Sequence, residues 1–381
     1  MKTIQKSILL MLLLVTSGAV SALADNLKYG ALYESDSTLV LYYDGFYQDR
    51  KAEGIPVYEI SSGQPGYCNS SPASIITKVV IDESFSNVYP QSMESWFYNL
   101  RAAREFVGLE NLKTGNVTNM QNLFQYCQSL VSIDLSSFDT RNVQNMQGMF
   151  SQCNSLKSLD LSSFKTNNVT NMGSMFSSCY SLKSVNLNSF NTSNVTSMYC
   201  MFYHCDSLTT LNLSRFNTSS VTNMSQMFQS NISLTELDLS KFDTSNVTNM
   251  YYMFGGCTNL VTVYVSDKWT TTKVTSDYGM FNKCEKLVGG NGTKWDSFYT
   301  KKDYARIDKA GQKGYFTEKI PAPDGDVNGD GEINVTDVTT LVSMILGSVE
   351  QTADADVNTD GSVDVSDVTA LVSIILNSSS N

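Results

Sequence analysis

The sequence has a single histidine, His204, among 381 residues. One histidine cannot form a multi-histidine metal site, and its scarcity removes most Ser-His and Cys-His nucleophilic catalysis. No glycine-rich phosphate-binding loop is present either. The sequence therefore offers no catalytic constellation, and we expect a protein that is not an enzyme.

Positive charge is missing from the C-terminal part of the chain. Residues 321–381 hold 11 acidic residues and no Lys or Arg, so this segment accounts for the whole net charge of −11. The remainder balances 26 acidic residues against 26 basic ones. A neutral body with an acidic tail argues against nucleic acid as a partner. Acidic residues gathered in one short segment suggest bound cations instead.

Long apolar runs are missing as well. Ile8–Val15 is too short to span a bilayer, and no other segment is apolar over 18 residues, so no membrane span is expected. Two lysines precede this run, and Ala22-Leu23-Ala24 offers small residues to a signal peptidase. Residues 1–24 are therefore predicted to be a secretory signal peptide, and the mature protein is predicted to be secreted or located at the cell surface.

The centre of the chain repeats itself with a period of 26 residues. The pentamer Asn116-Val117-Thr118-Asn119-Met120 recurs along the chain, and its valine falls at positions 117, 143, 169, 195, 221, 247 and 274. Six cysteines follow the same series: Cys127, Cys153, Cys179, Cys205, Cys257 and Cys284. Asn231 takes the place of the missing cysteine. Seven copies predict a solenoid, in which stacked units share a continuous core.

Each unit contains two apolar periodicities. The first has the spacing of one face of a short helix: Met146, Met149, Phe150 and Cys153. The second matches the leucine-rich-repeat strand, with alternate residues pointing inward: Leu156, Leu159 and Leu161. The predicted fold class is therefore α/β, a leucine-rich-repeat solenoid of short strands and short helices.

The ends of the repeat region depart from its period, as a solenoid requires in order to cover its exposed core. Trp96-Phe97 lies 27 residues before Leu123-Phe124, which predicts a degenerate unit ahead of the regular ones. The predicted order after the signal peptide is an N-terminal capping region (25–115), the solenoid (116–288), a C-terminal cap (289–319), a linker (320–325) and an acidic module (326–377).

Leu27 to Lys319 resembles the BspA-type leucine-rich-repeat surface proteins. The resemblance rests on Phe138-Asp139-Thr140, the repeated pentamer, the Met-Phe pair and the cysteine that follows it. It implies a secreted or surface-exposed role, often adhesive, toward host proteins or other cells. The macromolecular ligand of the solenoid is not identified by it.

Three repeated features permit both a functional and a structural interpretation. The Asn-Val-Thr triplets match a glycosylation signal, but their place in the repeat favours side chains that satisfy backbone groups at turns and helix starts.

The cysteines suggest metal or redox chemistry, whereas their place at the end of an apolar stripe favours packed free thiols. A polar column is predicted along the sheet face: Asp134, Asp160, Asn186, Asn212, Asp238 and Tyr264. Paired carboxylates can hydrolyse glycosides, but a column that recurs with the repeat favours a hydrogen-bonding ladder, which also makes a candidate binding surface.

Two segments of the acidic tail, 30 residues apart, match the 12-residue calcium loop. This loop places oxygen ligands at positions 1, 3, 5, 7, 9 and 12, with glycine at position 6. The predicted ligands of the first loop are Asp326, Asn328, Asp330, Glu332 through its backbone carbonyl, Asn334 and Asp337. Those of the second loop are Asp356, Asn358, Asp360, Ser362, Asp364 and Asp367. Two bound Ca²⁺ ions are therefore predicted.

The two loops depart from the EF-hand, because position 12 is Asp and each loop is followed by only one apolar helix pattern. In this respect Asp324 to Asn377 resembles a type I dockerin. The resemblance implies a small all-α calcium-binding domain that plugs into a protein partner, the cohesin of a polysaccharide-degrading assembly. Cohesin contacts in the family concentrate at loop positions 10 and 11, here Val335-Thr336 and Val365-Ser366. Valine at position 10 is less polar than the familiar serine.

Three functions follow from these observations. The first is an adhesin-like interaction protein, attached to a partner through a calcium-dependent dockerin-like tail. The second is a non-catalytic component of an extracellular, cellulosome-like complex. The third is a structural surface protein without a specific ligand.

Overall fold

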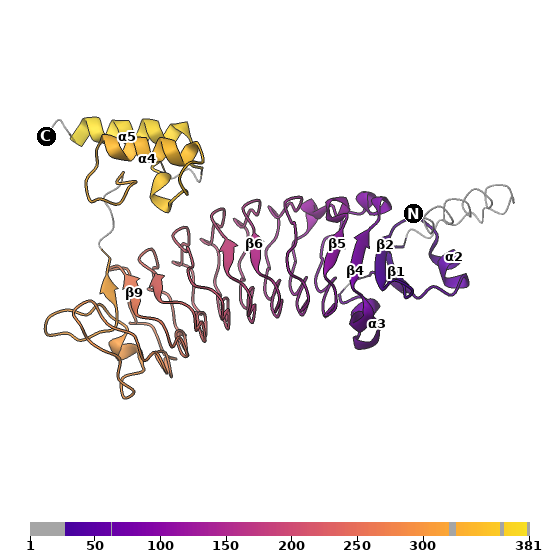
Figure 1. Ribbon diagram of the computed structural model, residues 1–381, viewed down its shortest axis with the longest axis horizontal. Helices are drawn as coiled ribbons and strands as arrows, with labels where there is room; N and C mark the ends of the chain where they lie inside the picture. Colours follow the sequence, from indigo (N-terminus) through magenta and orange to yellow (C-terminus); the bar gives the residue numbers. More distant parts are fainter. Residues whose placement is uncertain (1–26, 62, 320–324, 359–361, 379–381) are drawn as a thin grey trace.

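The computed structural model describes residues 27–61, 63–319, 325–358 and 362–378. The predicted signal peptide and residues 320–324 of the predicted linker lie outside these ranges. The described chain forms a long row of stacked coils, with a pair of helices lying over one end (Figure 1). Within the described residues, no helix combines the length and the apolar character needed to cross a bilayer.

The N-terminal part is a five-stranded sheet in the order β3-β1-β2-β4-β5. Its strands are β1 (Tyr29–Tyr33), β2 (Thr38–Tyr42), β3 (Val57–Glu59), β4 (Lys78–Ile81) and β5 (Glu105–Val107). The first three pair antiparallel, whereas β2 pairs with β4, and β4 with β5, in parallel. The sheet therefore joins an antiparallel end to the parallel stacking of the repeat.

Short helices connect and flank the strands of this region. They are α2 (Tyr47–Ala52), α3 (Ser70–Ile75) and the 3-10 turns η1 (Gly66–Cys68), η2 (Glu83–Asn87), η3 (Leu109–Asn111) and η4 (Thr114–Asn116). The predicted degenerate unit is present, because Ser92 bridges to Asn119 in parallel and the rings of Phe97 and Phe124 stack with centroids 5.3 Å apart.

The repeat array, which we define as residues 116–288, consists of coils joined by parallel bridges. The bridges link the fourth residue of successive pentamers: Asn119, Asn145, Asn171, Ser197, Asn223, Asn249 and Ser276. Short strands form on another side of some coils: β6 (Ser158–Asp160), β7 (Ser184–Asn186), β8 (Glu236–Asp238) and β9 (Thr262–Val265). β6 pairs with β7, and β8 with β9, in parallel.

The predicted helix within each unit is wrong. Met146 to Cys153 forms consecutive turns, and the N–H of Phe150 donates to the carbonyl of Met175 in the next coil over 2.9 Å. An α-helix would direct this N–H to its own fourth preceding residue. Gly148 and Gln152 both have a φ of 63°, which a helix does not allow. The stacked coil supplies the carbonyls, and the backbone adopts turns that face them.

The burial predicted for the same residues is nevertheless correct. Met146, Met149, Phe150 and Cys153 are all fully buried. One phenylalanine from each coil forms a continuous stack: Phe97, Phe124, Phe150, Phe176, Phe202, Phe228, Phe254 and Phe281. Leu159 and Leu161 are buried, whereas Asp160 between them is exposed, which confirms the predicted inward and outward positions of the strand.

Residues 289–319 cover the last coil. They include η5 (Lys302–Tyr304) and β10 (Thr317–Glu318), which pairs in parallel with β9. The buried ring of Phe316 contacts Trp269 and Phe281, with centroids 5.0 Å and 5.7 Å away. These aromatic contacts shield the end of the apolar stack from water.

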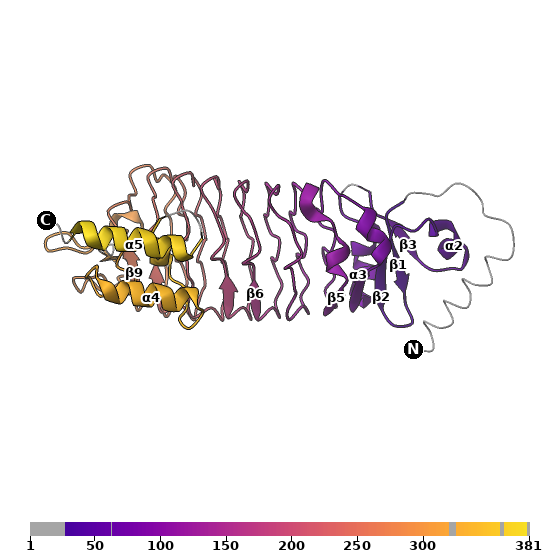
Figure 2. The same cartoon turned by 90° about the horizontal axis from the view of Figure 1, so that it is seen from above.

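The C-terminal module packs around its own core, formed by Val327, Leu341, Met344, Ala355 and Leu371. Its helices are α4 (Val335–Ile345) and α5 (Val365–Ser378), with η6 (Ala353–Ala355) between them. One helix follows each loop, as the sequence predicts. Two views at right angles place the module over the C-terminal coils of the repeat array (Figures 1 and 2).

Candidate functional site

The first predicted calcium loop is closed by two buried carboxylates. Asp326 is 1% exposed, and its two oxygens accept the N–H groups of Gly329 and Gly331, each over 2.8 Å. Asp337 is fully buried and accepts the N–H groups of Asn328 over 3.0 Å and Asn334 over 2.8 Å. Gly331 has a φ of 89°, so position 6 has the left-handed conformation for which glycine was expected.

The end of this loop is also the start of α4. Asn334 is the N-cap residue, and its side-chain oxygen accepts the N–H of Thr336 over 2.8 Å. In the reciprocal bond, the carboxylate of Asp337 accepts the backbone N–H of Asn334, which completes a capping box. Positions 9 and 12 of the loop thus fix the helix start and the loop at the same time.

The remaining predicted ligands of the first loop lie near the surface. Asn328 donates through its amide to Asp330 over 2.8 Å, which brings positions 3 and 5 together. The Asn334 amide donates to Glu332 over 3.4 Å, which brings positions 9 and 7 together. All six predicted residues of the first loop therefore lie in one short turn structure.

The second loop repeats part of this geometry. Asp367 is fully buried and accepts the N–H groups of Asn358 over 3.1 Å and Asp364 over 2.9 Å, as Asp337 does in the first loop. Hydrogen bonds from Ser366 hold the pKa of Asp364 below its ordinary 3.8. Asp360 lies outside the described residues, and Ser362 is exposed.

Asp356, at position 1 of the second loop, has a partner that sequence reasoning missed. Its Oδ2 accepts a hydrogen bond from Nη1 of Arg215, 2.7 Å away and 141 residues earlier in the chain. Asp354, two residues before Asp356, forms an ion pair with Lys241 over 3.5 Å. The module is thus connected to the repeat array through its second loop.

The chemistry of the first loop fits a calcium ion. Within the described parts of the chain, no three His, Cys, Asp or Glu side chains gather closely enough to hold a metal ion. However, Asp326 and Asp337 are buried carboxylates that accept hydrogen bonds from neutral backbone N–H groups. Burying such charges is unfavourable unless a positive charge compensates them. A hard divalent cation with oxygen ligands supplies that charge, so the chemistry favours the ligand assignments of the first loop. All twelve assignments remain predictions.

The cysteines of the array are free, as their packing predicted. The six repeated thiols are buried, and each donates to the carbonyl of a phenylalanine in the preceding coil, over 3.0–3.2 Å. Burial raises the pKa of Cys179 and of Cys257 from 9.0 to about 12. High pKa values disfavour the reactive thiolate. Cys68 is buried and donates to Trp96 O, while Cys200 is half-buried.

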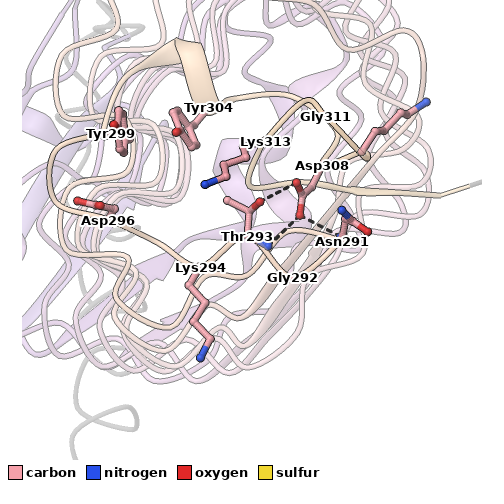
Figure 3. Close-up of a pocket in the computed structure, with 11 residues that line it drawn as sticks. Asn291, Gly292, Thr293, Lys294, Asp296, Tyr299, Tyr304, Asp308, Gly311 and Lys313 are labelled. Carbon is pink, nitrogen blue, oxygen red and sulfur yellow. Dashed lines mark hydrogen bonds between the residues drawn. The ribbon is translucent and has the colours of Figure 1, made fainter.

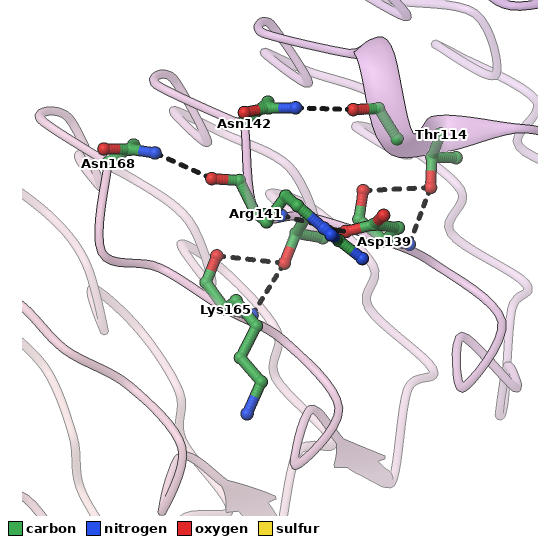
Figure 4. Close-up of polar contacts among 8 residues, drawn as sticks. Thr114, Asp139, Arg141, Asn142, Lys165 and Asn168 are labelled. Carbon is green, nitrogen blue, oxygen red and sulfur yellow. Dashed lines mark hydrogen bonds and ion pairs between the residues drawn. The ribbon is translucent and has the colours of Figure 1, made fainter. Parts of the chain in front are cut away.

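The repeated Asn-Val-Thr triplets bind backbone carbonyls of the neighbouring coil (Figure 4). Asn168 donates to the carbonyl of Arg141 over 2.8 Å, and Asn142, in the variant triplet Asn142-Val143-Gln144, donates to that of Gly115 over 2.7 Å. The threonine of the triplet does the same, as Thr170 donates to the carbonyl of Gln144 over 3.2 Å. This confirms the predicted backbone role, although the groups belong to turns and not to a helix start.

The predicted polar column is partly a hydrogen-bonded ladder. Asn186 donates to Asp160 over 3.0 Å, and Asp238 forms an ion pair with Lys319. Each Asp or Asn of the column also accepts the N–H two residues later, as Asp134 does from Ser136 over 2.9 Å. Asp134, Asp160 and Asn212 remain exposed and give the face its polar surface.

A polar cavity of about 500 Å³ lies in the C-terminal cap (Figure 3). Asp308 is almost completely buried beside it and accepts the N–H groups of Asn291 and Thr293, each over 2.9 Å. Tyr299 and Tyr304 stack on the opposite side with centroids 4.5 Å apart. Asp308 therefore fixes the cap turns.

Comparisons with known proteins bear on both parts of the chain. The model of the "Dockerin type I domain" family matches residues 324–376, which confirms the dockerin prediction for the tail. Type I dockerin domains bind calcium and attach to protein partners. The comparison with curated proteins found no match.

Two solved structures are similar to the chain, and both are described as leucine-rich repeat proteins. The one from Bacteroides ovatus ATCC 8483 is 15% identical, covers 71% of this chain and 82% of its own, and has a TM-score of 0.31. The one from Eubacterium ventriosum ATCC 27560 is 15% identical, covers 81% of this chain and 97% of its own, and has a TM-score of 0.25.

The repeat region matches a second family model, described as "Mycoplasma protein of unknown function, DUF285", over residues 91–211 and 178–295. The two overlapping matches fall on the coils that stack through the pentamer bridges. Because they span more than half of the 381 residues, the chain belongs to the DUF285 family and carries a type I dockerin domain at its C-terminal end.

Proposed function

We propose that this chain is a secreted or cell-surface interaction protein of the adhesin type. A leucine-rich-repeat solenoid (116–288), capped by residues 25–115 and 289–319, contacts a macromolecule. The dockerin domain (326–377), reached through a linker (320–325), attaches the solenoid to a protein partner. The observation that carries this proposal is the joining of a type I dockerin domain to a long array of stacked coils. One chain thus combines an attachment module with an extended surface.

Calcium binding by the dockerin domain is the first part of the proposal. Asp326, Asp330 and Asp337 of the first loop, with their counterparts in the second, hold one Ca²⁺ ion each. The ion supplies the positive charge that the acidic module lacks. Asp337 and Asp367 link the loops to the starts of α4 and α5, so a filled loop also fixes the direction of the helix that follows it.

Partner binding by the same domain is the second part. Val335 and Val365 begin the two helices at equivalent positions and are 69% and 70% exposed. Apolar side chains at such exposure are suited to burial in a protein interface. A cohesin is the partner expected from the family. The duplication gives the domain two near-equivalent contact segments.

The macromolecular ligand of the solenoid is proposed to bind on the polar face. Asp134, Asp160 and Asn212 recur along this face at the spacing of the coils and are exposed. A regular row of polar groups is suited to an extended ligand that touches several coils, as solenoid proteins commonly use their faces.

The test of attachment compares the mature chain with a variant that carries Asp330→Ala and Asp360→Ala. We expect the unaltered chain to be retained by an immobilised type I cohesin in calcium and released by a chelator. The double variant should not be retained, because each loop loses a ligand. Asp134→Ala, which removes a carboxylate from the array, is the matched control and should be retained. Retention of the double variant in the presence of chelator would overturn calcium-dependent attachment.

A second candidate function is that of a non-catalytic component in an extracellular polysaccharide-degrading complex. The type I dockerin match favours it, because this domain type serves such assemblies. The purified mature chain should then release no reducing sugar from polysaccharides but should co-purify with active complexes in calcium. Reproducible sugar release by the chain alone would contradict the absence of catalysis.

A further inference from the structure

Two basic residues of the repeat array contact the acidic segment around the second calcium loop. Arg215 donates to Asp356 over 2.7 Å, and Lys241 pairs with Asp354 over 3.5 Å. The side chain of Asp356 is only 3% exposed, and that of Arg215 is 25% exposed. Figure 2 shows the module lying along the C-terminal coils, where these residues are found.

The two basic residues occupy the same position in successive coils. This position directly precedes a buried aromatic residue and is Ser137, Ser163 and Ser189 in the first three coils, then Arg215, Lys241 and Lys268. The core cannot account for this change, because the neighbouring aromatic residues are buried in all six coils. The basic coils are those beneath a module whose segment 321–381 has 11 acidic residues and no basic one.

Arg215 engages a predicted calcium ligand whose counterpart in the first loop has no hydrogen bond or ion pair with the array among the residues that the structure describes. There, both oxygens of Asp326 accept N–H groups of their own loop, from Gly329 and Gly331. In the second loop, Oδ2 of Asp356 accepts a hydrogen bond from Arg215. A fixed positive charge beside a ligand oxygen opposes the arrival of a divalent cation through like-charge repulsion. The first loop has no such contact with the array among the interactions of the described residues.

The contact has the character of a reversible one. A cleft of about 230 Å³ remains between the two parts, lined by Lys165, Asn188 and Arg215 on one side and by Gln351, Thr352 and Val363 on the other. The side chains of Lys241 and Asp354 are 50% and 46% exposed, and ion pairs this exposed contribute little stability. In the other pair Asp356 is buried, while Arg215 remains 25% exposed.

We propose that the array surface formed by Arg215 and Lys241 is a docking site for Asp354 and Asp356, at the start of the second calcium loop of the same chain, and that docking and calcium binding at this loop oppose each other. This inference rests on the proposed calcium function of the domain. Coupling between the two events is reciprocal: calcium weakens docking by the same factor by which docking weakens calcium binding. The two loops, near-copies in sequence, therefore differ in calcium affinity within the intact chain.

The test uses the mature full-length chain with Asp330→Ala, so that the second loop is the main remaining calcium site. Calcium titration by calorimetry then compares three proteins: this background alone, with Arg215→Met, and with Arg141→Met. Arg141 is the control, because it pairs with Asp139 of its own coil. We expect Arg215→Met to raise calcium affinity about fivefold or more, the lower range of typical couplings, and Arg141→Met to leave it unchanged. Equal affinities in all three proteins would overturn the opposition between docking and calcium.

X-ray scattering of the chain with both loops intact provides a second readout. We expect calcium to increase the radius of gyration of the unaltered chain, and Arg215→Met to give the larger value even with chelator. If no protein binds calcium, the proposed calcium function fails and the opposition fails with it. The docking site is then decided by scattering alone: an unchanged radius on Arg215→Met would overturn it.

Discussion

Asn231 donates through its side-chain amide to the carbonyl of Phe202 over 2.8 Å, in the place where other coils use a cysteine thiol. In the adjacent coils Cys205 and Cys257 bind the carbonyls of Phe176 and Phe228. The asparagine thus preserves the bond between coils and adds one to Phe228 O over 2.7 Å. Its own Oδ1 is buried without a hydrogen-bond partner.

Replacing Asn231 by cysteine should stabilise the array. The thiol keeps the bond to Phe202 and removes the buried carbonyl oxygen, whose unmet hydrogen bond costs about 1–3 kcal/mol. We expect a higher denaturant midpoint with an unchanged slope. Cys153→Asn is the matched reverse change and should lower the midpoint, because it introduces the same unsatisfied oxygen into a regular coil. A lower midpoint for Asn231→Cys would show that the amide is the better partner.

The array should lose stability in alkaline solution. Burial raises the pKa of Cys179 and Cys257 from 9.0 to about 12, and raises the pKa of the other four repeated thiols as well. Below pH 9 both states keep the proton and no penalty arises. Above pH 9 the unfolded chain releases protons that the folded chain retains. Each such thiol therefore lowers the free energy of unfolding by about 1.4 kcal/mol for every pH unit.

Urea titrations between pH 8 and 11 measure this effect. A Cys179→Ala, Cys257→Ala variant is less stable at pH 8 but should lose stability more slowly as the pH rises. Parallel pH profiles for the variant and the unaltered chain would show that these thiols do not cause the loss.

A single-residue comparison tests the inward and outward sides of a strand. Leu161→Ala should cost about 2–5 kcal/mol, because it leaves a cavity in a fully buried position. Asp160→Ala should cost no more than about 1 kcal/mol, because the hydrogen bonds that it removes are exposed and water replaces them. Chemical denaturation of both variants provides the measurement, and similar midpoints would contradict the assignment.

Removal of calcium should unfold the dockerin domain and leave the array intact. Without the ion, the acidic module has only a small core to oppose the repulsion of its carboxylates. α4 and α5 are the longest helices described, with 11 and 14 residues, so circular dichroism at 222 nm reports chiefly on this domain. A chelator should reduce this signal and expose residues 326–377 to protease. An unchanged signal with an unchanged cleavage pattern would refute the calcium dependence.

The periodicity of the sequence predicts burial better than it predicts backbone conformation. Met146, Met149, Phe150 and Cys153 have helical spacing and are buried, yet Phe150 donates its N–H to the next coil. Side-chain spacing reports which residues face the core, whereas the hydrogen-bond partner depends on a coil 25 residues later. The Leu-x-x-Leu-x-Leu segment forms the predicted strand in the coils of β6, β7, β8 and β9, because its alternation is specific to an extended backbone.

The candidate site shows a similar division. Asp326 to Asp337 follow a local pattern, and their loop, glycine turn and helix start could be predicted from spacing alone. The contact between Arg215 and Asp356 joins residues 141 positions apart, and no local pattern encodes it. The available signal was the change from serine to a basic residue at one repeat position, which becomes meaningful only when the acidic module is known to lie above it.

The bridges between coils have an evolutionary consequence. Each coil presents the same donors and acceptors to both neighbours, so duplication or loss of one 26-residue unit leaves every remaining interface complete. The separation between the N-terminal sheet and the dockerin domain can therefore change in steps of about 4.8 Å, the distance between neighbouring strands. Units gained before Ser189 lengthen the molecule without moving Arg215 and Lys241 away from the acidic segment that they contact. The length of the array and the docking of the module can therefore evolve independently.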